Sequence, residues 1–221
     1  MPDEQNITHS YIIDFVRENL KKSEGILYEL EDFAHKNEVP IVQKEVSAFL
    51  EVICRIHKPV KVLEVGCAIG YSAILMAKNL PQNAHVTTIE RDEKMAELAR
   101  QNFKRAGMED KIDILEADAE VLLEAMDEKY DMIFMDASKA HYIHFLPQCV
   151  RMLNVGGLLI SDNILYAGMV ANNDLLIRRK ITIVKRLREY IKKICAAPYF
   201  KTSILSIGDG IGLCYKLCEK E

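Results

Sequence analysis

Glycines and acidic side chains stand directly after successive apolar runs of the sequence, where a cofactor could be bound. Gly66 and Gly70 follow the first run, and Glu90, Asp118 and Asp136 follow the next three. Glycines let the backbone turn sharply and approach a ligand, but the G-x-x-x-G spacing is not the G-x-G-x-x-G of a dinucleotide-binding loop. Three carboxylates disfavour a phosphate and favour a cationic ligand, and Glu90 is placed to accept both hydroxyls of a ribose. S-adenosylmethionine fits this description, although Asp118 on its own is equally consistent with a helix N-cap.

A second group of polar side chains indicates a divalent cation. Asp136 follows the fourth apolar run, and Asp162 and Asn163 follow the fifth. Two carboxylates and an amide oxygen are the hard ligands that Mg²⁺ prefers, and Mn²⁺ accepts the same donors. A substrate with oxygens on adjacent carbons could chelate such an ion, which would lower the pKa of the attacking hydroxyl. Lys139 could accept the hydroxyl proton if the cation depresses its pKa; the simpler alternatives are a turn at Asp162-Asn163 and a solvated lysine.

Histidine and cysteine residues do not form a second metal-binding pattern. His141 and His144 flank a tyrosine on an expected helix, where they edge the pocket or face solvent. The six cysteines include no C-x-x-C and have no histidine at zinc-site spacing. We expect reduced, mostly buried thiols.

Strands alternating with helices must position the polar side chains at one edge of a sheet. The expected strands are Val60–Val65, His85–Ile89, Ile112–Leu115, Met132–Met135 and Leu158–Ser161. The helices expected between them are near Tyr71–Asn79, Lys94–Ala106, Val121–Met126 and Tyr142–Leu153. This alternation predicts right-handed crossovers and a parallel sheet, in which ligands bind outside the carboxyl ends of the strands.

The two ends of the chain follow different patterns. The first sixty residues have helical spacing, and the third helix is expected to open at Pro40. Towards the other end, a helix over Leu175–Ile194 precedes two strands, Lys201–Ile207 and Ile211–Lys216, which are joined by a Gly-Asp-Gly turn. We therefore predict a Rossmann-like α/β fold with a mostly parallel seven-stranded sheet, an antiparallel C-terminal hairpin and an N-terminal helical extension.

Length and composition are consistent with one such unit. The chain has 221 residues, of which 49% are hydrophobic and 28% charged, so collagen-like and largely disordered classes are excluded. We expect residues 1–58 to form the helical extension and residues 59–221 the main domain, packed as a single structural unit. Residues 1–10 contain no cationic-then-apolar leader, and no apolar run is long enough to span a membrane. We therefore expect a cytoplasmic protein without a membrane partner.

Charge is distributed unevenly along the chain. The net charge of −4 argues against a nucleic-acid partner when it is averaged over all residues. Residues 178–193, however, contain eight basic side chains and one acidic side chain. Apolar residues in this segment keep helical spacing, so we expect one face to pack and the basic residues to project outward. Such a segment is either an ordinary solvated helix face or a nucleic-acid-binding surface.

These motifs resemble those of the cation-dependent O-methyltransferases of the catechol and caffeoyl-CoA type. The resemblance rests on Val62–Ser72, Asp136-x-x-Lys139, Asp162-Asn163 and the Gly208-Asp209-Gly210 turn, and it covers the chain from about Val39 onward. It implies a methyltransferase fold, a Mg²⁺-assisted methyl transfer to one oxygen of a vicinal pair, catalytic roles for Asp136 and Lys139, and a homodimer. The cofactor contacts that it implies are Val42, Gly66, Ser72, Glu90, Asp118, Ala119 and Asp136. The chain departs from many small-molecule members because it has no Trp and no evident aromatic residues around a flat substrate.

A closer resemblance is to the bacterial tRNA 5-hydroxyuridine methyltransferases within this family. It rests on Val39–Ile41, Ala68–Ile74, the Arg178–Lys180 cluster and Pro198-Tyr199. It implies that the substrate is 5-hydroxyuridine at the wobble position of a tRNA anticodon stem-loop, and that the product is 5-methoxyuridine. The 5-hydroxyl and 4-carbonyl of this base are vicinal oxygens, and a base in an anticodon loop is easily unstacked. The residues expected to bind tRNA are Arg178, Arg179, Lys180, Lys185 and Arg186.

Two other functions are consistent with the same residues. The protein could be a small-molecule catechol or caffeoyl-CoA-type O-methyltransferase, in which case its activity on free catechols should rival that on tRNA. It could also be a cofactor-binding interaction protein without catalysis. That possibility would be excluded if Asp162→Ala abolished methyl transfer and left cofactor binding intact.

Overall fold

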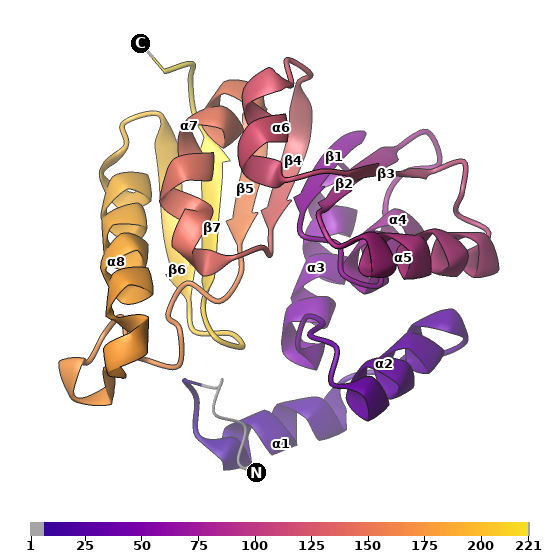
Figure 1. The fold of residues 1–221 in the computed structure, drawn as a ribbon, viewed down its shortest axis with the longest axis horizontal. Helices are drawn as coiled ribbons and strands as arrows, with labels where there is room; N and C mark the ends of the chain where they lie inside the picture. Colours follow the sequence, from indigo (N-terminus) through magenta and orange to yellow (C-terminus); the bar gives the residue numbers. More distant parts are fainter. Residues whose placement is uncertain (1–6, 221) are drawn as a thin grey trace.

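A seven-stranded sheet forms the centre of the computed structural model, which describes residues 7–220 (Figure 1). Residues 1–6 and Glu221 lie outside the described residues, so the expected absence of a leader in residues 1–10 falls largely outside them. The strand order is β3-β2-β1-β4-β5-β7-β6. The strands are β1 (Lys61–Val65), β2 (His85–Glu90), β3 (Ile112–Glu116), β4 (Tyr130–Met135), β5 (Leu153–Ser161), β6 (Phe200–Leu205) and β7 (Ile211–Lys216).

Strands β1 to β5 run parallel, whereas β7 pairs antiparallel with both β5 and β6. The predicted mostly parallel sheet with a closing antiparallel hairpin is therefore confirmed. The order reverses between β1 and β4, because the chain builds β1, β2 and β3 outward on one side and then returns to add β4 on the other. In open α/β sheets this switch point, at the carboxyl ends of the strands, is where ligands bind.

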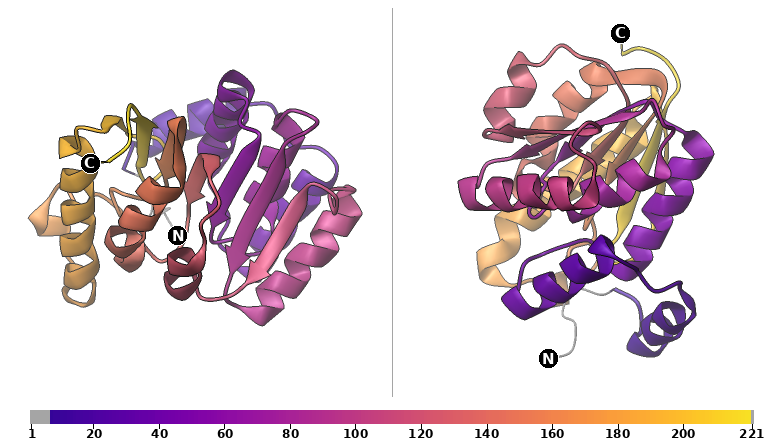
Figure 2. Two further views of the ribbon diagram at one scale, coloured as in Figure 1. Left: turned by 90° about the horizontal axis from the view of Figure 1, so that it is seen from above. Right: turned by 90° about the vertical axis from the view of Figure 1, so that its right-hand side faces the viewer.

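Helices cover both faces of the sheet (Figure 2). One hydrophobic cluster joins helices α2 to α5 to the sheet, and a second joins α6 to α8 to its other face. Figure 1 shows α1 and α2 beyond the carboxyl ends of the parallel strands, so the N-terminal helices border the edge where a ligand would bind. The helices are α1 (Ser10–Asn19), α2 (Ile26–Asn37), α3 (Lys44–His57), α4 (Tyr71–Asn79), α5 (Glu93–Ala106), α6 (Ala119–Ala125), α7 (Tyr142–Met152) and α8 (Ile181–Ala196), with 3₁₀ turns η1 (Lys139–His141), η2 (Asn173–Leu175) and η3 (Arg178–Lys180).

Two expected helix starts are wrong. The third helix does not open at Pro40: the residues from Val39 to Gln43 are not helical, and α3 begins at Lys44. The helix expected from Leu175 begins only at Ile181, after two 3₁₀ turns. The physical reason in the second case is packing. Buried residues of α8 start at Val184, whereas Ile177 is 49% exposed, so the apolar side chain before α8 gains little from packing in a helix.

Two further expectations concern the chain as a whole. In residues 7–220, no helix is long and apolar enough to cross a membrane. All six cysteines are free thiols, and four of them are buried. The division into residues 1–58 and 59–221 stays a prediction.

Candidate active site

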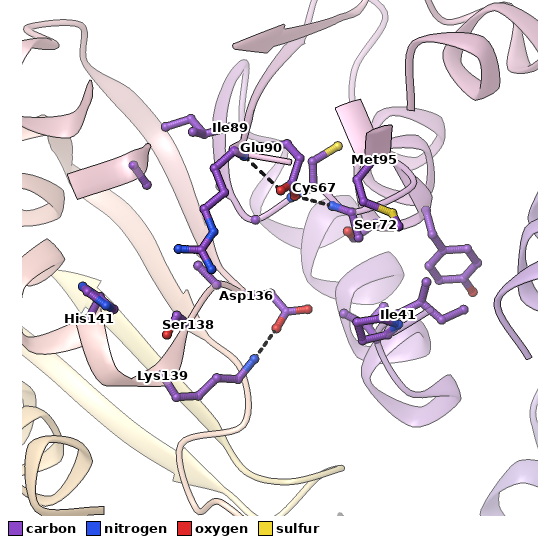
Figure 3. Close-up of a pocket in the computed structure, with 18 of the residues that line it drawn as sticks. Ile41, Cys67, Ser72, Ile89, Glu90, Met95, Asp136, Ser138, Lys139 and His141 are labelled. Carbon is purple, nitrogen blue, oxygen red and sulfur yellow. Dashed lines mark hydrogen bonds and ion pairs between the residues drawn. The ribbon is translucent and has the colours of Figure 1, made fainter. Parts of the chain in front are cut away.

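A cavity of about 380 Å³ lies at the carboxyl ends of β1, β2 and β4, and the extended segment before α3 closes one side of it (Figure 3). The structure brings every residue predicted to contact the cofactor into the lining of this one cavity, although the contacts themselves stay a prediction. These lining residues are Val42, Gly66, Ser72, Glu90, Asp118, Ala119 and Asp136. Lys139 and His141 also line the cavity, whereas His144 is exposed.

Gly66 allows the first strand to end against the fourth. Its φ is +99°, and a Cβ at this position would collide with the backbone carbonyl of Asp136. The Asp136 N–H in turn donates to the Val65 carbonyl, at 2.9 Å. A side chain at position 66 would therefore separate β1 from Asp136.

Glu90 is fixed in place before any ligand arrives. Its Oε2 accepts the N–H groups of Ala68 and Cys67, at 2.8 and 3.3 Å, and its Oε1 accepts those of Arg91 and Asp92, both at 2.9 Å. The carboxylate therefore joins the end of β2 to the loop after β1. Ribose hydroxyls would have to share these oxygens with the backbone.

Asp118 caps a helix. It is the N-cap of α6, and its Oδ1 accepts the Glu120 N–H at 2.8 Å. The structural alternative considered for Asp118 is therefore correct. The residue also lines the cavity, so capping holds its carboxylate at the mouth of the site.

Glu64 is a buried carboxylate that does not line the cavity but interacts with two carboxylates that do, and no role was predicted for it from the sequence. It lies inside β1, it is fully buried, and Thr88 donates to its Oε2 at 2.5 Å. Among the described residues its Oε1 is the one buried side-chain oxygen or nitrogen without a hydrogen-bond partner. Burial raises the pKa of Glu64 to about 7, which the hydroxyls of Ser72 and Thr88 oppose and the carboxylates of Asp136 and Glu90 reinforce. A carboxylate in an otherwise apolar strand was the available signal.

Asp136 and Lys139 form an ion pair at the wall of the cavity (Figure 3). Lys139 Nζ donates to Asp136 Oδ1 at 2.8 Å, and each side chain is about one-fifth exposed. Burial lowers the pKa of Lys139, but the carboxylates of Asp136, Asp162 and Asp209 outweigh it and hold the pKa above its ordinary value. The Lys139 amine is therefore charged when no cation or cofactor is bound. A proton acceptor needs a lower pKa than Lys139 has in this state.

Asp162 and Asn163 lie behind Asp136, away from the lining of the cavity. The Asp162 N–H donates to the carbonyl of Met135, the residue before Asp136, at 3.0 Å. Asp162 is 2% exposed, and burial together with the charge of Asp136 raises the pKa of its carboxyl. Asn163 has a φ of +55°, in the left-handed region that Asn tolerates better than most residues.

Asp209, which was noted only as part of a hairpin turn, also faces this group. It is 4% exposed and accepts the Ala167 N–H at 2.5 Å. Burial raises the pKa of Asp209 to about 7, and its charge raises the pKa of both Lys139 and Asp162. Three carboxylates therefore surround one ammonium group.

This donor set fits a hard divalent cation. Asp136 and Asp162 repel one another in the protein alone, and a cation would relieve that repulsion. In the described part of the chain, no three His, Cys, Asp or Glu side chains are grouped so as to hold a metal ion. A cation on the two carboxylates would therefore complete its coordination with the Asn163 amide oxygen, water or substrate.

The basic segment is only partly free. Arg178, Arg179 and Lys185 are exposed. Lys180 lies over the ring of Tyr166, with Nζ 5.4 Å from the centroid, and Arg186 donates to the Ala140 carbonyl at 3.2 Å. The expectation that the basic residues project outward holds for Arg178, Arg179, Lys185, Lys192 and Lys193, which are exposed, but not for Lys180, Arg186 and Arg188, which are half-buried. Figure 1 shows η3 and the start of α8 on the side of the carboxyl ends of the parallel strands.

Comparison with known proteins gives a consistent result. The family model described as O-methyltransferase matches residues 17–217. A caffeoyl-CoA O-methyltransferase from Populus kitakamiensis is 32% identical over 177 residues, which cover 77% of this chain and 75% of the relative. Tapetum-specific methyltransferase 1 from Arabidopsis thaliana is 30% identical and covers 77% and 76%.

Solved structures share the whole fold. A protein from Staphylococcus aureus is 34% identical, with a TM-score of 0.82 and coverage of 94% of this chain and 98% of that one. The O-methyltransferase from Bacillus cereus, solved in complex with SAH, is 24% identical, with a TM-score of 0.83 and coverage of 98% and 100%. At that identity the second likeness concerns the fold alone.

Proposed function

The chain belongs to the O-methyltransferase family that includes the plant caffeoyl-CoA O-methyltransferases, and from that premise we propose that it methylates tRNA. The proposed substrate is 5-hydroxyuridine at the wobble position of the anticodon stem-loop, and the product is 5-methoxyuridine. The proposed methyl donor is S-adenosylmethionine, with Mg²⁺ or Mn²⁺ as the cation.

The chemistry of the cavity supports S-adenosylmethionine as the donor. Glu90, Asp118 and Asp136 line the cavity, and the buried Glu64 carboxylate adds to their negative charge from behind the lining, which suits a ligand that carries an ammonium and a sulfonium. Glu90 and Asp118 stand at the ends of β2 and β3 for the ribose and the adenine amino group. The loop from Gly66 to Ser72 and the side chains of Val42 and Ala119 would enclose the rest of the molecule.

Asp136, Asp162 and Asn163 are the proposed cation ligands. When bound, the cation would supply the positive charge that holds two vicinal substrate oxygens and acidifies the hydroxyl. Asp136 borders the cavity while Asp162 lies behind it. A cation bound by Asp136 would therefore lie beside the proposed methyl donor and hold the reacting oxygen near the methyl group. Lys139 Nζ is the proposed proton acceptor, which requires that it leave its ion pair with Asp136.

The observation that carries the choice of tRNA is that Arg178, Arg179 and Lys185 are exposed, in a segment on the side of the molecule where the parallel strands end. Such basic side chains suit the phosphates of a stem-loop whose base enters the cavity. The 5-hydroxyl and 4-carbonyl of the base provide the vicinal pair that a cation can chelate.

A small-molecule substrate is the second candidate, and the relatives favour it. The similar Populus protein is a caffeoyl-CoA O-methyltransferase, and a catechol offers the same vicinal oxygens. Tyr166, which follows the proposed cation ligand Asn163, could contact a flat ring. The basic cluster would then bind the phosphates of an acyl-CoA instead of RNA.

One experiment separates the two candidates. Purified protein with Mg²⁺ and labelled S-adenosylmethionine is offered tRNA that carries 5-hydroxyuridine, a free catechol and caffeoyl-CoA, each as sole acceptor. We expect kcat/KM to be highest for the tRNA by at least about 100-fold. Equal or faster labelling of the catechol or the CoA ester would favour the small-molecule function.

The proposed assembly is a homodimer formed through α3. Val52 and Ile56 project from this helix one turn apart and are 56% and 71% exposed. Exposed apolar side chains grouped in this way are typical of interaction surfaces.

A further inference from the structure

We propose that Tyr142 is a positioning residue that holds the three cation ligands in register; this inference rests on the proposed metal site. Tyr142 begins α7, it is fully buried, and its ring packs edge to face on Tyr190 of α8 with centroids 5.6 Å apart. The ring is therefore fixed from both helices. It does not line the active-site cavity.

The Tyr142 hydroxyl joins the ends of the two strands that carry the ligands. It donates to the carbonyl of Met135 at 2.9 Å and to that of Asp162 at 3.1 Å, so one proton is shared between them. The Met135 carbonyl belongs to the peptide that leads into Asp136, and the Asp162 carbonyl to the peptide that leads into Asn163. One phenol thereby fixes the backbone on which all three proposed ligands stand.

This contact matters because the backbone after Asp162 lies beyond the end of β5 and is not held by regular strand pairing. Asn163 has a φ of +55°, and Ile164 is tied instead to the hairpin turn through its hydrogen bond to the Gly210 carbonyl. Removing the hydroxyl would deprive the buried Asp162 carbonyl of its donor and favour rotation of the Asp162–Asn163 peptide. The carboxylates would remain, but their spacing would no longer be set for one ion.

Tyr142→Phe tests this role, because the variant keeps the ring and its packing. Mn²⁺ binding is measured by electron paramagnetic resonance, and S-adenosylhomocysteine binding by calorimetry. We expect the Kd for Mn²⁺ to rise by about 10- to 100-fold, and the Kd for S-adenosylhomocysteine to stay within about 2-fold. Methyl transfer should recover at saturating Mn²⁺, which a damaged fold would not allow.

Tyr130→Phe is the matched control. Tyr130 is a buried tyrosine at the start of β4, at the opposite end of that strand from Met135. Its hydroxyl donates to Glu128 at 3.2 Å. We expect this variant to bind Mn²⁺ as the wild type does. Unchanged Mn²⁺ affinity in Tyr142→Phe would overturn the inference and leave the proposed function standing, as would equal losses in both variants. A wild-type protein that binds no Mn²⁺ would overturn the proposed metal site and the inference together.

Discussion

At the scale of single residues, burial raises the pKa of three carboxyl groups around the candidate site. Glu64, Asp162 and Asp209 are each less than 5% exposed, and burial raises the pKa of each. Such groups are costly for the folded protein when they are charged. A bound cation removes that cost, so the site is electrostatically incomplete without its ligands.

Glu64 should give the ligand-free protein a pH-dependent stability. Its pKa is about 7 in the folded protein, against the ordinary glutamate value of 4.5. Between these values the folded state holds a proton that the unfolded state has lost, so stability falls as pH rises and levels off above about 7. Relative to Glu64→Gln, wild type should lose about 2 to 3 kcal/mol of unfolding free energy between pH 5 and pH 8, as measured by urea unfolding. Parallel pH profiles for the two proteins would contradict this prediction.

Asp162→Ala should separate chemistry from cofactor binding. The residue lies behind the cavity and does not line it. We expect kcat to fall by at least about 100-fold, while the Kd for S-adenosylhomocysteine changes by less than about 3-fold. Treatment of the wild type with a chelator should reproduce the loss, and added Mg²⁺ should reverse it. Full activity in chelator would refute the cation assignment.

Candidate residues at strand ends could be named from the sequence, whereas those inside strands could not. Asp136 and Asp162 were found because parallel strands bring their carboxyl ends to one edge. Glu64 was missed because no general rule places ligands at positions inside a strand. Asp209 was missed because the Gly-Asp-Gly hairpin turn is enough to account for an aspartate at this position. Tyr142 could not be found, since its role depends on two carbonyls 27 residues apart that only the folded sheet brings together.

At the scale of elements, the sheet was predictable and the helix starts were not. Apolar runs bounded by turns defined the strands to within a few residues, because burial on both faces demands such runs. The segment from Val39 to Gln43 stays extended despite Pro40, and it lines the cavity instead. Local sequence signals for a helix do not predict whether tertiary contacts hold a segment in an extended conformation.

The turn η3, directly before α8, should contribute to RNA binding more than the end of α8. Arg178→Ala with Arg179→Ala removes two exposed charges beside the site. We expect at least about a tenfold loss of tRNA affinity and a salt slope reduced by about 2, with cofactor affinity unchanged. The matched control is Lys192→Ala with Lys193→Ala, near the end of α8. Equal losses for the two pairs would show that only net charge matters.

At the scale of the whole molecule, average charge conceals the arrangement that the proposed function needs. The net charge is −4, although residues 178–193 carry eight basic side chains and one acidic. In the proposed function the acidic groups of the cavity would bind the cofactor and the cation, and the basic segment would bind the tRNA. Composition excluded several classes of protein correctly, but only the fold shows that the start of α8 lies on the side where the parallel strands end (Figure 1).

The α3 surface should control assembly. Val52→Asp with Ile56→Asp places charge on two exposed apolar positions and should convert a dimer to a monomer in sedimentation analysis. Val121→Asp, on α6 and 71% exposed, is the control and should leave the dimer intact. A wild-type protein that sediments as a monomer would contradict the proposed assembly.

Nucleoside mass spectrometry of tRNA from cells that lack this protein tests the proposed function most directly. Deletion should remove 5-methoxyuridine and its derivatives and cause 5-hydroxyuridine to accumulate, and wild-type protein but not Asp162→Ala should restore the modification. An unchanged modification profile in the deletion strain would contradict the proposed function.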